Sequence, residues 1–224
     1  MNIGLKVHPT LVLASSSPRR IELLTRLGIP FKVHASSFNE EKPRITPDPQ
    51  LFALSQARGK ARDVAAHYPQ ALVLGADTIV WLDTKIYGKP RSREEARRFL
   101  RALSEKAHQV VTGLVLIDTS ENTTYEEAVT STVAFKPLTE EDISRYLATN
   151  EHMGKAGAYA IQGAAASFVA SLSGDYCNVM GLPLRALAGM LSCCGMPVDE
   201  GLMRRAETEY QTQQLRQEQF LPRT

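Results

Sequence analysis

The stretch from Ala71 to Leu82 constrains the fold more than any other part of this sequence. It is almost continuously apolar and includes the β-branched residues Val73, Ile79 and Val80. A run of this length and composition is typical of a strand that is covered on both faces. Such a strand needs other elements packed on each side of it. The segment therefore predicts the central strand of a layered α/β fold.

Shorter strand and helix patterns flank this run. Expected strands cover 11–14, 31–34, 109–117 and 130–135, with shorter candidates at 158–161 and 167–172. Expected helices cover 18–27, 51–66, 93–102, 140–148 and 182–193, while 36–49 holds three prolines and is expected to be a loop. No repeat or Gly/Ser-rich linker divides the chain, so we expect a single domain over residues 1–197. The polar tail, 198–224, is expected to be helical or disordered; a solvated appendage is favoured over a subunit contact.

Composition excludes several classes of function. Charged residues make up 22% of the 224 residues and the net charge is only +2, which does not predict nucleic-acid binding. Three cysteines, two of them adjacent, form neither a secreted disulfide framework nor a zinc-binding pattern. No apolar stretch is long enough to span a membrane, and the first residues lack the pattern of a signal peptide. We expect a cytoplasmic protein with no membrane or nucleic-acid partner.

The segment from Ser15 to Arg20 carries the first chemical signal. Ser17 and Pro18 are typical of a helix start, as N-cap and first helical residue. Arg19 and Arg20 then fall in the first turn, where the helix dipole disfavours cations. A bound anion would remove this conflict, because backbone N–H groups, hydroxyls and guanidinium groups would all face it. A surface helix with two solvated arginines agrees equally well with the spacing.

A carboxylate inside the apolar run is the second signal. Asp77 costs free energy in a buried strand unless it is paired, hydrogen-bonded or bound to a metal. Such positions are often functional, so a site is favoured over an Asp that caps a turn at the strand end. Further along, Lys89 lies between Gly88 and Pro90, and the proline favours an extended backbone at this lysine.

Other polar residues have two interpretations each. Lys60 borders the apolar stripe of its helix, and it either reaches into a cleft or, more commonly, extends along the surface to solvent. Glu40 lies in the polar loop, where a solvated charge is ordinary. Gln162 follows an apolar segment, so its amide either reads the edge of a base or caps a turn. His108 is interpreted as structural.

Taken together, five segments resemble the Maf family of nucleoside triphosphate pyrophosphatases over about residues 10–192. They are Leu-Ala-Ser-Ser-Ser-Pro-Arg-Arg (13–20), Gly-Ala-Asp-Thr (75–78), Gly-Lys-Pro (88–90), Lys-Ala-Gly-Ala-Tyr-Ala-Ile-Gln-Gly (155–163) and Gly-Leu-Pro-Leu (181–184). The resemblance implies a two-lobed α/β fold with a mixed sheet, similar to inosine triphosphate pyrophosphatases, with the active-site cleft between the lobes. It also implies a homodimer and a divalent metal cofactor, Mg²⁺ or Mn²⁺.

The form of the fourth segment resembles the dTTP/UTP branch of the family, since the branch acting on 7-methyl-GTP usually has Glu at the position of Gln162. The implied reaction is hydrolysis of dTTP and UTP to the monophosphate and pyrophosphate, as nucleotide-pool housecleaning, with CTP and modified pyrimidine nucleotides as further candidates. The implied catalytic residues are Asp77, Glu40, Lys60 and Lys89, with Asp77 and Glu40 also holding the metal. Implied substrate-binding residues are Ser15, Ser17, Arg19, Arg20, Thr78 and Gln162, with Arg19, Thr78 and Gln162 at positions associated with base selectivity.

Two positions depart from the family pattern. Asn39 and Gly154 stand where Asp is frequent, which shifts the expected metal binding toward Glu40 and Asp77. Two other functions remain as alternatives. A non-hydrolytic nucleotide-binding regulator of cell division or septum formation would bind nucleotide without forming product. A nucleic-acid-binding protein is disfavoured by scattered basic residues and by few aromatic side chains for stacking.

Overall fold

The computed structural model describes residues 9–40, 48–206 and 208 of the chain. Within these residues, seven strands form one mixed sheet in the order β2-β1-β3-β5-β6-β7, with β4 paired to β3 off this path. The strands are β1 (Thr10–Leu13), β2 (Phe31–Val33), β3 (Ala71–Leu82), β4 (Lys85–Tyr87), β5 (Ala107–Asp118), β6 (Thr123–Phe135) and β7 (Val169–Ser173). The helices are α1 (Pro18–Arg26), α2 (Pro49–Ala65), α3 (Arg93–Leu103), α4 (Glu140–Ala148), α5 (Tyr176–Met180) and α6 (Leu184–Cys193), with 3₁₀ turns η1 (Ala156–Ala158) and η2 (Ala164–Phe168).

Strand β3 is the central strand that its apolar sequence predicts. It pairs in parallel with β1 and antiparallel with β5. Leu72 and Leu74 pack into the main core, while the alternating residues Ala71 and Val73 pack into a separate apolar cluster with Val64 of α2. Burial on both faces explains the unbroken apolar run. The mixed sheet with helices on both faces confirms the predicted α/β class.

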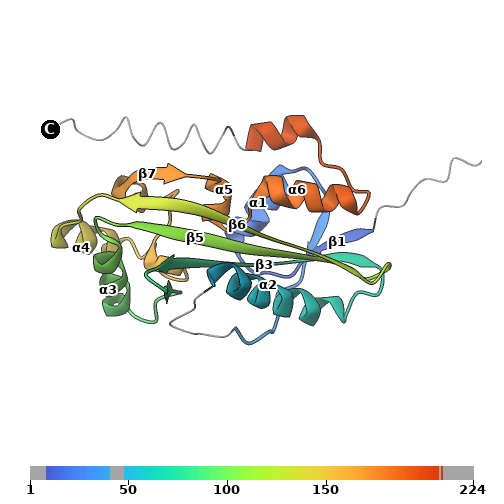
Figure 1. The fold of residues 1–224 in the computed structure, drawn as a ribbon, viewed down its shortest axis with the longest axis horizontal. Helices are drawn as coiled ribbons and strands as arrows, with labels where there is room; N and C mark the ends of the chain where they lie inside the picture. Colours follow the sequence, from blue (N-terminus) through green and yellow to red (C-terminus); the bar gives the residue numbers. More distant parts are fainter. Residues whose placement is uncertain (1–8, 41–47, 207, 209–224) are drawn as a thin grey trace, which may run out of the picture.

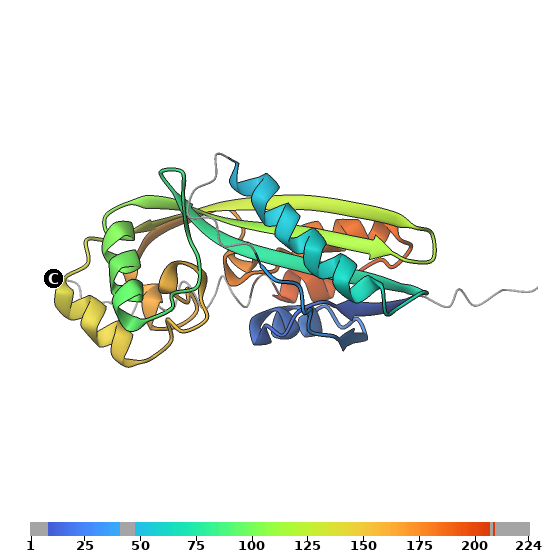
Figure 2. The same cartoon turned by 90° about the horizontal axis from the view of Figure 1, so that it is seen from below.

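Helix α2 lies diagonally across one face of the long strands (Figure 2). Two glycines of the sheet allow this close approach. A Cβ atom on Gly75 would lie 2.3 Å from the carbonyl oxygen of Ala57, and one on Gly113 would lie 2.6 Å from the backbone of Ala53. Both contacts are too short for any side chain, so glycine is required. The close packing brings Lys60 of α2 directly over β3.

The remaining helices form two groups at opposite ends of the long strands β3, β5 and β6 (Figure 1). Helices α1 and α6 lie near β1 and β2, whereas α3 and α4 pack together near η1. Glu140 joins α3 and α4 through ion pairs to Arg97 and Arg101, at 2.8 and 2.5 Å.

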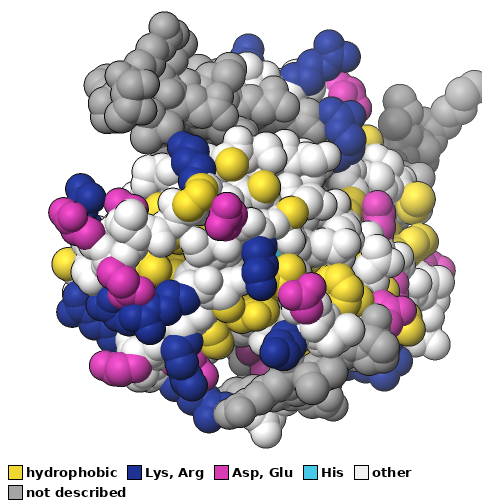
Figure 3. Space-filling view, turned by 60° about the vertical axis from the view of Figure 1, so that its left-hand side comes forward, with side chains coloured by type: hydrophobic (Ala, Val, Ile, Leu, Met, Phe, Trp, Pro, Cys, Tyr) yellow, Lys and Arg dark blue, Asp and Glu magenta, His cyan; other side chains and the backbone are white. Residues whose placement is uncertain are grey.

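On the face of the molecule that Figure 3 shows, basic side chains lie among acidic ones, so this face offers no continuous positive surface.

Some predicted boundaries were wrong. The expected strand at 158–161 does not form: Ala158 ends η1 with a φ of +62°, which an extended strand does not allow, and residues 159–160 have no regular secondary structure. Strand β6 begins at Thr123 rather than at residue 130; its first half is largely exposed, which hides the apolar alternation. The short strand β4 and helix α5 were not predicted, and the last predicted helix begins at Leu184.

The tail begins with helical residues at 200–206. Met203 and Ala206 are each 3% exposed and belong to the main core, and Leu202 lies against Gly28. This first part of the predicted tail is therefore packed on the domain rather than solvated. Residues 209–224 lie outside the described residues. No helix in the described part of the chain has the length and apolar character to cross a membrane.

Candidate active site

A cavity of about 430 Å³ opens between the two groups of helices. Its walls come from the β1–α1 loop and α1, the loop after β2, one turn of α2, the middle of β3, Lys89, residues 154–156, Tyr159 and the end of α5. Sequence segments far apart in the chain thus meet in one cleft. The structure brings nine of the ten predicted site residues to it: Ser15, Ser17, Arg19, Arg20, Glu40, Lys60, Asp77, Thr78 and Lys89.

A chain of alternating charges crosses the floor of the cavity. Lys60 Nζ donates to Asp77 Oδ1 at 2.5 Å and lies 2.7 Å from Glu40 Oε1. The other oxygen of Glu40 lies 3.6 Å from Lys89 Nζ. Lys60 and Asp77 are only 7% and 8% exposed. Lys60 is therefore an inward-facing lysine that pairs two carboxylates, which identifies it as part of the site rather than a surface-directed side chain.

Glu40 is held in its charged form by these neighbours. Partial burial opposes its ionisation, but the charges and hydrogen bonds of Lys60 and Lys89 outweigh this and hold the pKa of Glu40 below its ordinary 4.5. The carboxylates of Asp77 and Glu40 both pair with Lys60, so their oxygen atoms lie close together and are available as metal ligands. Mg²⁺ is commonly held by one or two carboxylates together with substrate phosphates. Asp77 and Glu40 therefore fit the implied metal, although no cluster of three potential protein ligands occurs among the described residues.

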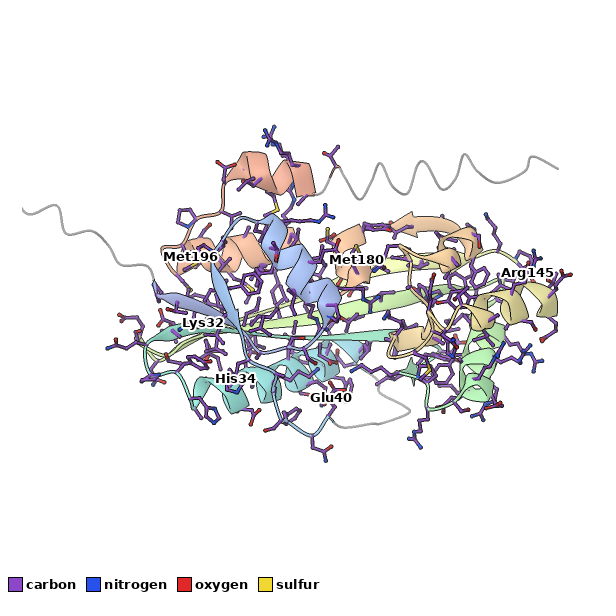
Figure 4. The ribbon with its side chains drawn as sticks, turned by 180° about the vertical axis from the view of Figure 1, so that it is seen from behind. Lys32, His34, Glu40, Arg145, Met180 and Met196 are labelled. Carbon is purple, nitrogen blue, oxygen red and sulfur yellow. The ribbon has the colours of Figure 1, made fainter. Side chains whose placement is uncertain are left out.

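The loop that carries Glu40 is fastened to α2 (Figure 4). Asp63 of α2 accepts hydrogen bonds from the hydroxyl of Ser36 and the backbone N–H of Ser37, both at 2.7 Å. The ring of Phe38 lies over Gly59, where a Cβ atom would come within 2.3 Å of it. This support of the loop was not predicted from the sequence. Its only sign there was Gly59, a glycine inside an otherwise regular helical pattern.

The start of α1 has the features of an anion site. Ser17 is the N-cap but makes no capping hydrogen bond with its side chain, and no acidic residue lies in the first turn. Arg20 is fixed by three acceptors: the Gly181 carbonyl at 2.8 Å, Thr78 Oγ1 at 3.1 Å and Ser15 Oγ at 3.4 Å. These three hydrogen-bond acceptors are all neutral groups. The structure thus favours phosphate binding over the alternative of two solvated arginines.

Burial makes these cations costly in the absence of an anion. It lowers the pKa of Arg20, against the opposing charges of Asp77 and Glu40. It also lowers the pKa of Arg19, and the charge of Arg20 adds to this effect. Both guanidinium groups remain charged at neutral pH, because an arginine side chain does not lose its proton in proteins. Two half-buried like charges in one cavity are stabilised by a polyanionic ligand.

The end of the molecule that carries α3, α4 and η1, here called the second lobe, contributes a wall that sequence reasoning did not assign to the site. Lys155, Ala156 and Tyr159 line the cavity, and so does Gly154 with a φ of +67°. Burial, followed by the charge of Arg19, lowers the pKa of Lys155. The sequence did point to this wall, because Lys155 and Tyr159 lie in the fourth of the five segments that resemble the family. An Asp at position 154, frequent in the family, would need this left-handed backbone, which Asp adopts more readily than most residues.

Gln162 is not among the cavity-lining residues. It is half-buried and follows Ile161 in the turn before η2. Its role in base selectivity therefore remains a prediction. His108 is 2% exposed, and its Nε2 lies 2.9 Å from the hydroxyl of Tyr159. Burial lowers the pKa of His108 to about 4, so the ring is neutral at pH 7.

This arrangement suits one kind of chemistry. Arg19, Arg20, Lys60, Lys89 and Lys155 supply five cationic side chains around one cavity, which matches a substrate with several phosphates. Asp77 and Glu40 supply the only carboxylates among the residues described as lining it. They are able to orient a water molecule and to bind a metal ion.

Several known proteins are similar to this chain. The Ham1 protein of Staphylococcus aureus has 14% sequence identity, and the matched region covers 56% of this chain and 71% of that one, with a TM-score of 0.42. The dTTP/UTP pyrophosphatase of Symbiobacterium thermophilum is 48% identical over 192 residues, which cover 85% of this chain and 97% of the relative. That of Pelotomaculum thermopropionicum is 46% identical over 189 residues, which cover 84% and 98%.

The family assignment follows from the sequence as a whole. The model of the Maf-like protein family matches residues 10–194, which include every site residue discussed above. The chain therefore belongs to the Maf family.

Proposed function

We propose that this protein is a nucleoside triphosphate pyrophosphatase that hydrolyses dTTP and UTP to the monophosphate and pyrophosphate. One observation carries the proposal: the paired carboxylates Asp77 and Glu40 share a cavity with the arginine-rich start of α1. Relatives with 42–48% identity are named dTTP/UTP pyrophosphatases, which supports the choice of substrates.

The phosphates bind between the start of α1 and the lysines. Backbone N–H groups of the first helical turn face the anion, together with Ser15, Ser17 and Arg20. Arg20 has donors left after its three protein contacts, because a guanidinium group carries five N–H bonds. Lys60 and Lys89 lie beside Glu40 and contribute compact positive charges.

Asp77 acts as the base for hydrolysis. It orients a water molecule and takes its proton as the water attacks the α-phosphorus in line with the leaving pyrophosphate. Lys60 holds the carboxylate in place and keeps a second negative group, Glu40, near it. Asp77 and Glu40 would hold a Mg²⁺ or Mn²⁺ ion, which would supply charge stabilisation for the phosphate oxygens.

Base selectivity is assigned to Gln162 and Arg19. An amide offers a donor and an acceptor side by side, which complements the edge of uracil or thymine. Arg19 lies beside Tyr146 and Tyr159 in the second lobe, and this supports a place near the base rather than the phosphates. CTP and modified pyrimidine nucleotides are further candidate substrates on the same grounds.

The biological setting is part of the proposal. A cytoplasmic homodimer that removes nucleotides from the pool fits a small-molecule hydrolase of this family. Nucleic acid is not a proposed partner, since the surface charges in Figure 3 are mixed and the net charge is only +2.

Product analysis over a panel of nucleotides tests the proposal. Purified protein is incubated with Mg²⁺ or Mn²⁺ and dTTP, UTP, CTP, GTP or 7-methyl-GTP, and pyrophosphate is measured separately from orthophosphate. Pyrophosphate released chiefly from dTTP and UTP is the expected result. Preference for 7-methyl-GTP would keep the reaction and overturn the substrate choice. Nucleotide binding without product would instead favour a non-hydrolytic regulator of cell division.

A further inference from the structure

The loop after β2 brings Glu40 to the cavity without regular secondary structure of its own. Residues 34–40 form neither helix nor strand, and they lead past His34 to Glu40 alongside α2 (Figure 4). Ordering an irregular segment costs conformational entropy, so side-chain contacts have to keep it in one conformation. The groups that fix this loop therefore also fix the position of Glu40.

Helix α2 contacts this loop at three points along one face. Gly59 and Asp63 are one helical turn apart, with Lys60 next to Gly59. The ring of Phe38 lies over Gly59, and Lys60 Nζ lies 2.7 Å from Glu40 Oε1. Asp63 is the third point of contact, and it holds the part of the loop nearest to β2.

Asp63 binds the loop through both oxygens of its carboxylate. Its Oδ2 accepts from the hydroxyl of Ser36 and from the backbone N–H of Ser37, both at 2.7 Å, and its Oδ1 accepts from the Ser37 hydroxyl at 3.0 Å. The oxygen of Ser36 in turn accepts from the backbone N–H of Phe38 at 3.0 Å. These bonds to Asp63, that from Ser36 first, lower the pKa of its carboxyl below the ordinary 3.8, so the group is ionised at neutral pH.

Asp63 is not among the residues described as lining the cavity. Its influence on the site therefore passes through the loop. From this geometry we infer that Asp63 is a positioning residue for Glu40: its hydrogen bonds to the loop keep Glu40 beside Lys60, where Glu40 would hold the divalent metal. The inference rests on the proposed function, because it takes Glu40 as a metal ligand. A loop without these bonds would present Glu40 to the metal in a fraction of the molecules, and the apparent metal affinity would fall by that fraction.

Binding of Mn²⁺ to two variants tests the inference. Asp63→Ala removes every acceptor and suits a helix. Asp63→Asn is its matched control, because the amide oxygen still accepts from Ser36 and Ser37 and the NH₂ group donates to the Ser37 hydroxyl. Mn²⁺ binding is measured by electron paramagnetic resonance in the presence of a dTTP analogue with a non-hydrolysable bridge between the α- and β-phosphorus. Asp63→Ala should raise the Kd of Mn²⁺ by about 10-fold, the worth of one or two hydrogen bonds, and Asp63→Asn by less than about 2-fold.

A double-mutant cycle with Glu40→Gln shows whether Asp63 acts through Glu40. In the Glu40→Gln background, Asp63→Ala should change the Kd of Mn²⁺ by less than about 2-fold, because the ligand that Asp63 positions is already absent. In Asp63→Ala alone, the Mn²⁺ concentration for half-maximal pyrophosphate release should rise by the same factor as the Kd. The kcat at saturating Mn²⁺ should remain close to the wild-type value. A general loss of stability would not produce this combination.

Other outcomes would overturn the inference. A wild-type Kd for Mn²⁺ in Asp63→Ala would do so, and so would a wild-type protein that binds no Mn²⁺. An equal rise of the Kd in Asp63→Asn would assign the effect to charge, and an undiminished rise in the Glu40→Gln background would mean that Asp63 acts on another group. If Asp63→Ala does not fold, Ser37→Ala takes its place, with an expected rise of about 3-fold for one lost hydrogen bond.

Failure of the proposed function would give a different result. The wild-type protein would then bind Mn²⁺ and the analogue but release no pyrophosphate from dTTP or UTP. The Mn²⁺ affinities of the variants would still show whether Asp63 positions Glu40.

Discussion

Replacing Asp77 by Asn removes the proposed base while keeping the shape of the side chain. Asp77 is 8% exposed, and its Oδ1 lies 2.5 Å from Lys60 Nζ. The amide still fills the site and still offers an oxygen to Lys60, but it cannot take a proton from water. General-base catalysis contributes about 10²- to 10⁴-fold to a rate, which is about 3–5 kcal/mol of activation free energy. We expect kcat to fall by this factor.

Binding and stability should change far less than kcat. With no divalent metal present, loss of a negative charge beside a polyanion removes repulsion, so the Kd of the triphosphate should stay equal or fall. Breaking a buried ion pair costs about 3–5 kcal/mol when it leaves a charge unpaired. Here Lys60 keeps Glu40 at 2.7 Å, so we expect a loss of only about 1–2 kcal/mol in unfolding free energy.

The assay measures pyrophosphate release, nucleotide binding by calorimetry and thermal unfolding on the same samples. Asp83→Asn is the matched control, since Asp83 is exposed in the β3–β4 turn and its φ of +50° suits Asn. This control loses the same charge and should keep wild-type turnover. Near-normal turnover in Asp77→Asn would refute the role of Asp77. An equal loss in the control would show that net charge, not the base, governs the rate.

Three further predictions follow from the packing, the pKa values and the arginine. Gly75→Ala should lower the unfolding free energy by about 1–3 kcal/mol in denaturant titrations, because its Cβ would meet the backbone of α2, whereas Gly189→Ala, with no atom within 4 Å, should not. Unfolding free energy should fall by about 3 kcal/mol as pH is lowered from 6.5 to about 4, since the unfolded chain protonates His108 and the folded chain does not. His108→Gln should make the unfolding free energy depend less on pH in this range. An unchanged pH dependence in this variant would contradict the lowered pKa of His108. Arg20→Lys should lower kcat/KM by about 10- to 100-fold, because an ammonium group cannot reach all three acceptors, and full activity would contradict a fixed guanidinium group.

The sequence features that predicted the structure best were residues whose contribution to the folding free energy depends mainly on burial. The apolar run at β3 had to be covered on both faces, and Asp77 within it had to find a partner, so both were predictable without a structure. The arginines at the start of α1 were informative for the same reason, because their position conflicts with the helix dipole.

What the sequence did not predict depends on contacts between distant segments. Lys60 resembles any lysine at the border of an apolar stripe, and only the packing of α2 on Gly75 turns it toward Asp77. The segment 158–161 is apolar, yet it forms no strand, and its first residue, Ala158, ends η1 with a positive φ. Thr112 is one hydroxyl within an apolar strand, and its hydrogen-bond partners are 34 and 66 residues away.

In the proposed mechanism, water oriented by Asp77 attacks the α-phosphorus. Hydrolysis of dTTP in ¹⁸O-labelled water, followed by mass spectrometry of both products, tests this step. Attack at the α-phosphorus places the label in the thymidine monophosphate and leaves pyrophosphate unlabelled. Label in the pyrophosphate would mean attack at the β-phosphorus, and labelled orthophosphate would mean attack at the γ-phosphorus. Either result would contradict the placement of the triphosphate between the start of α1 and Asp77.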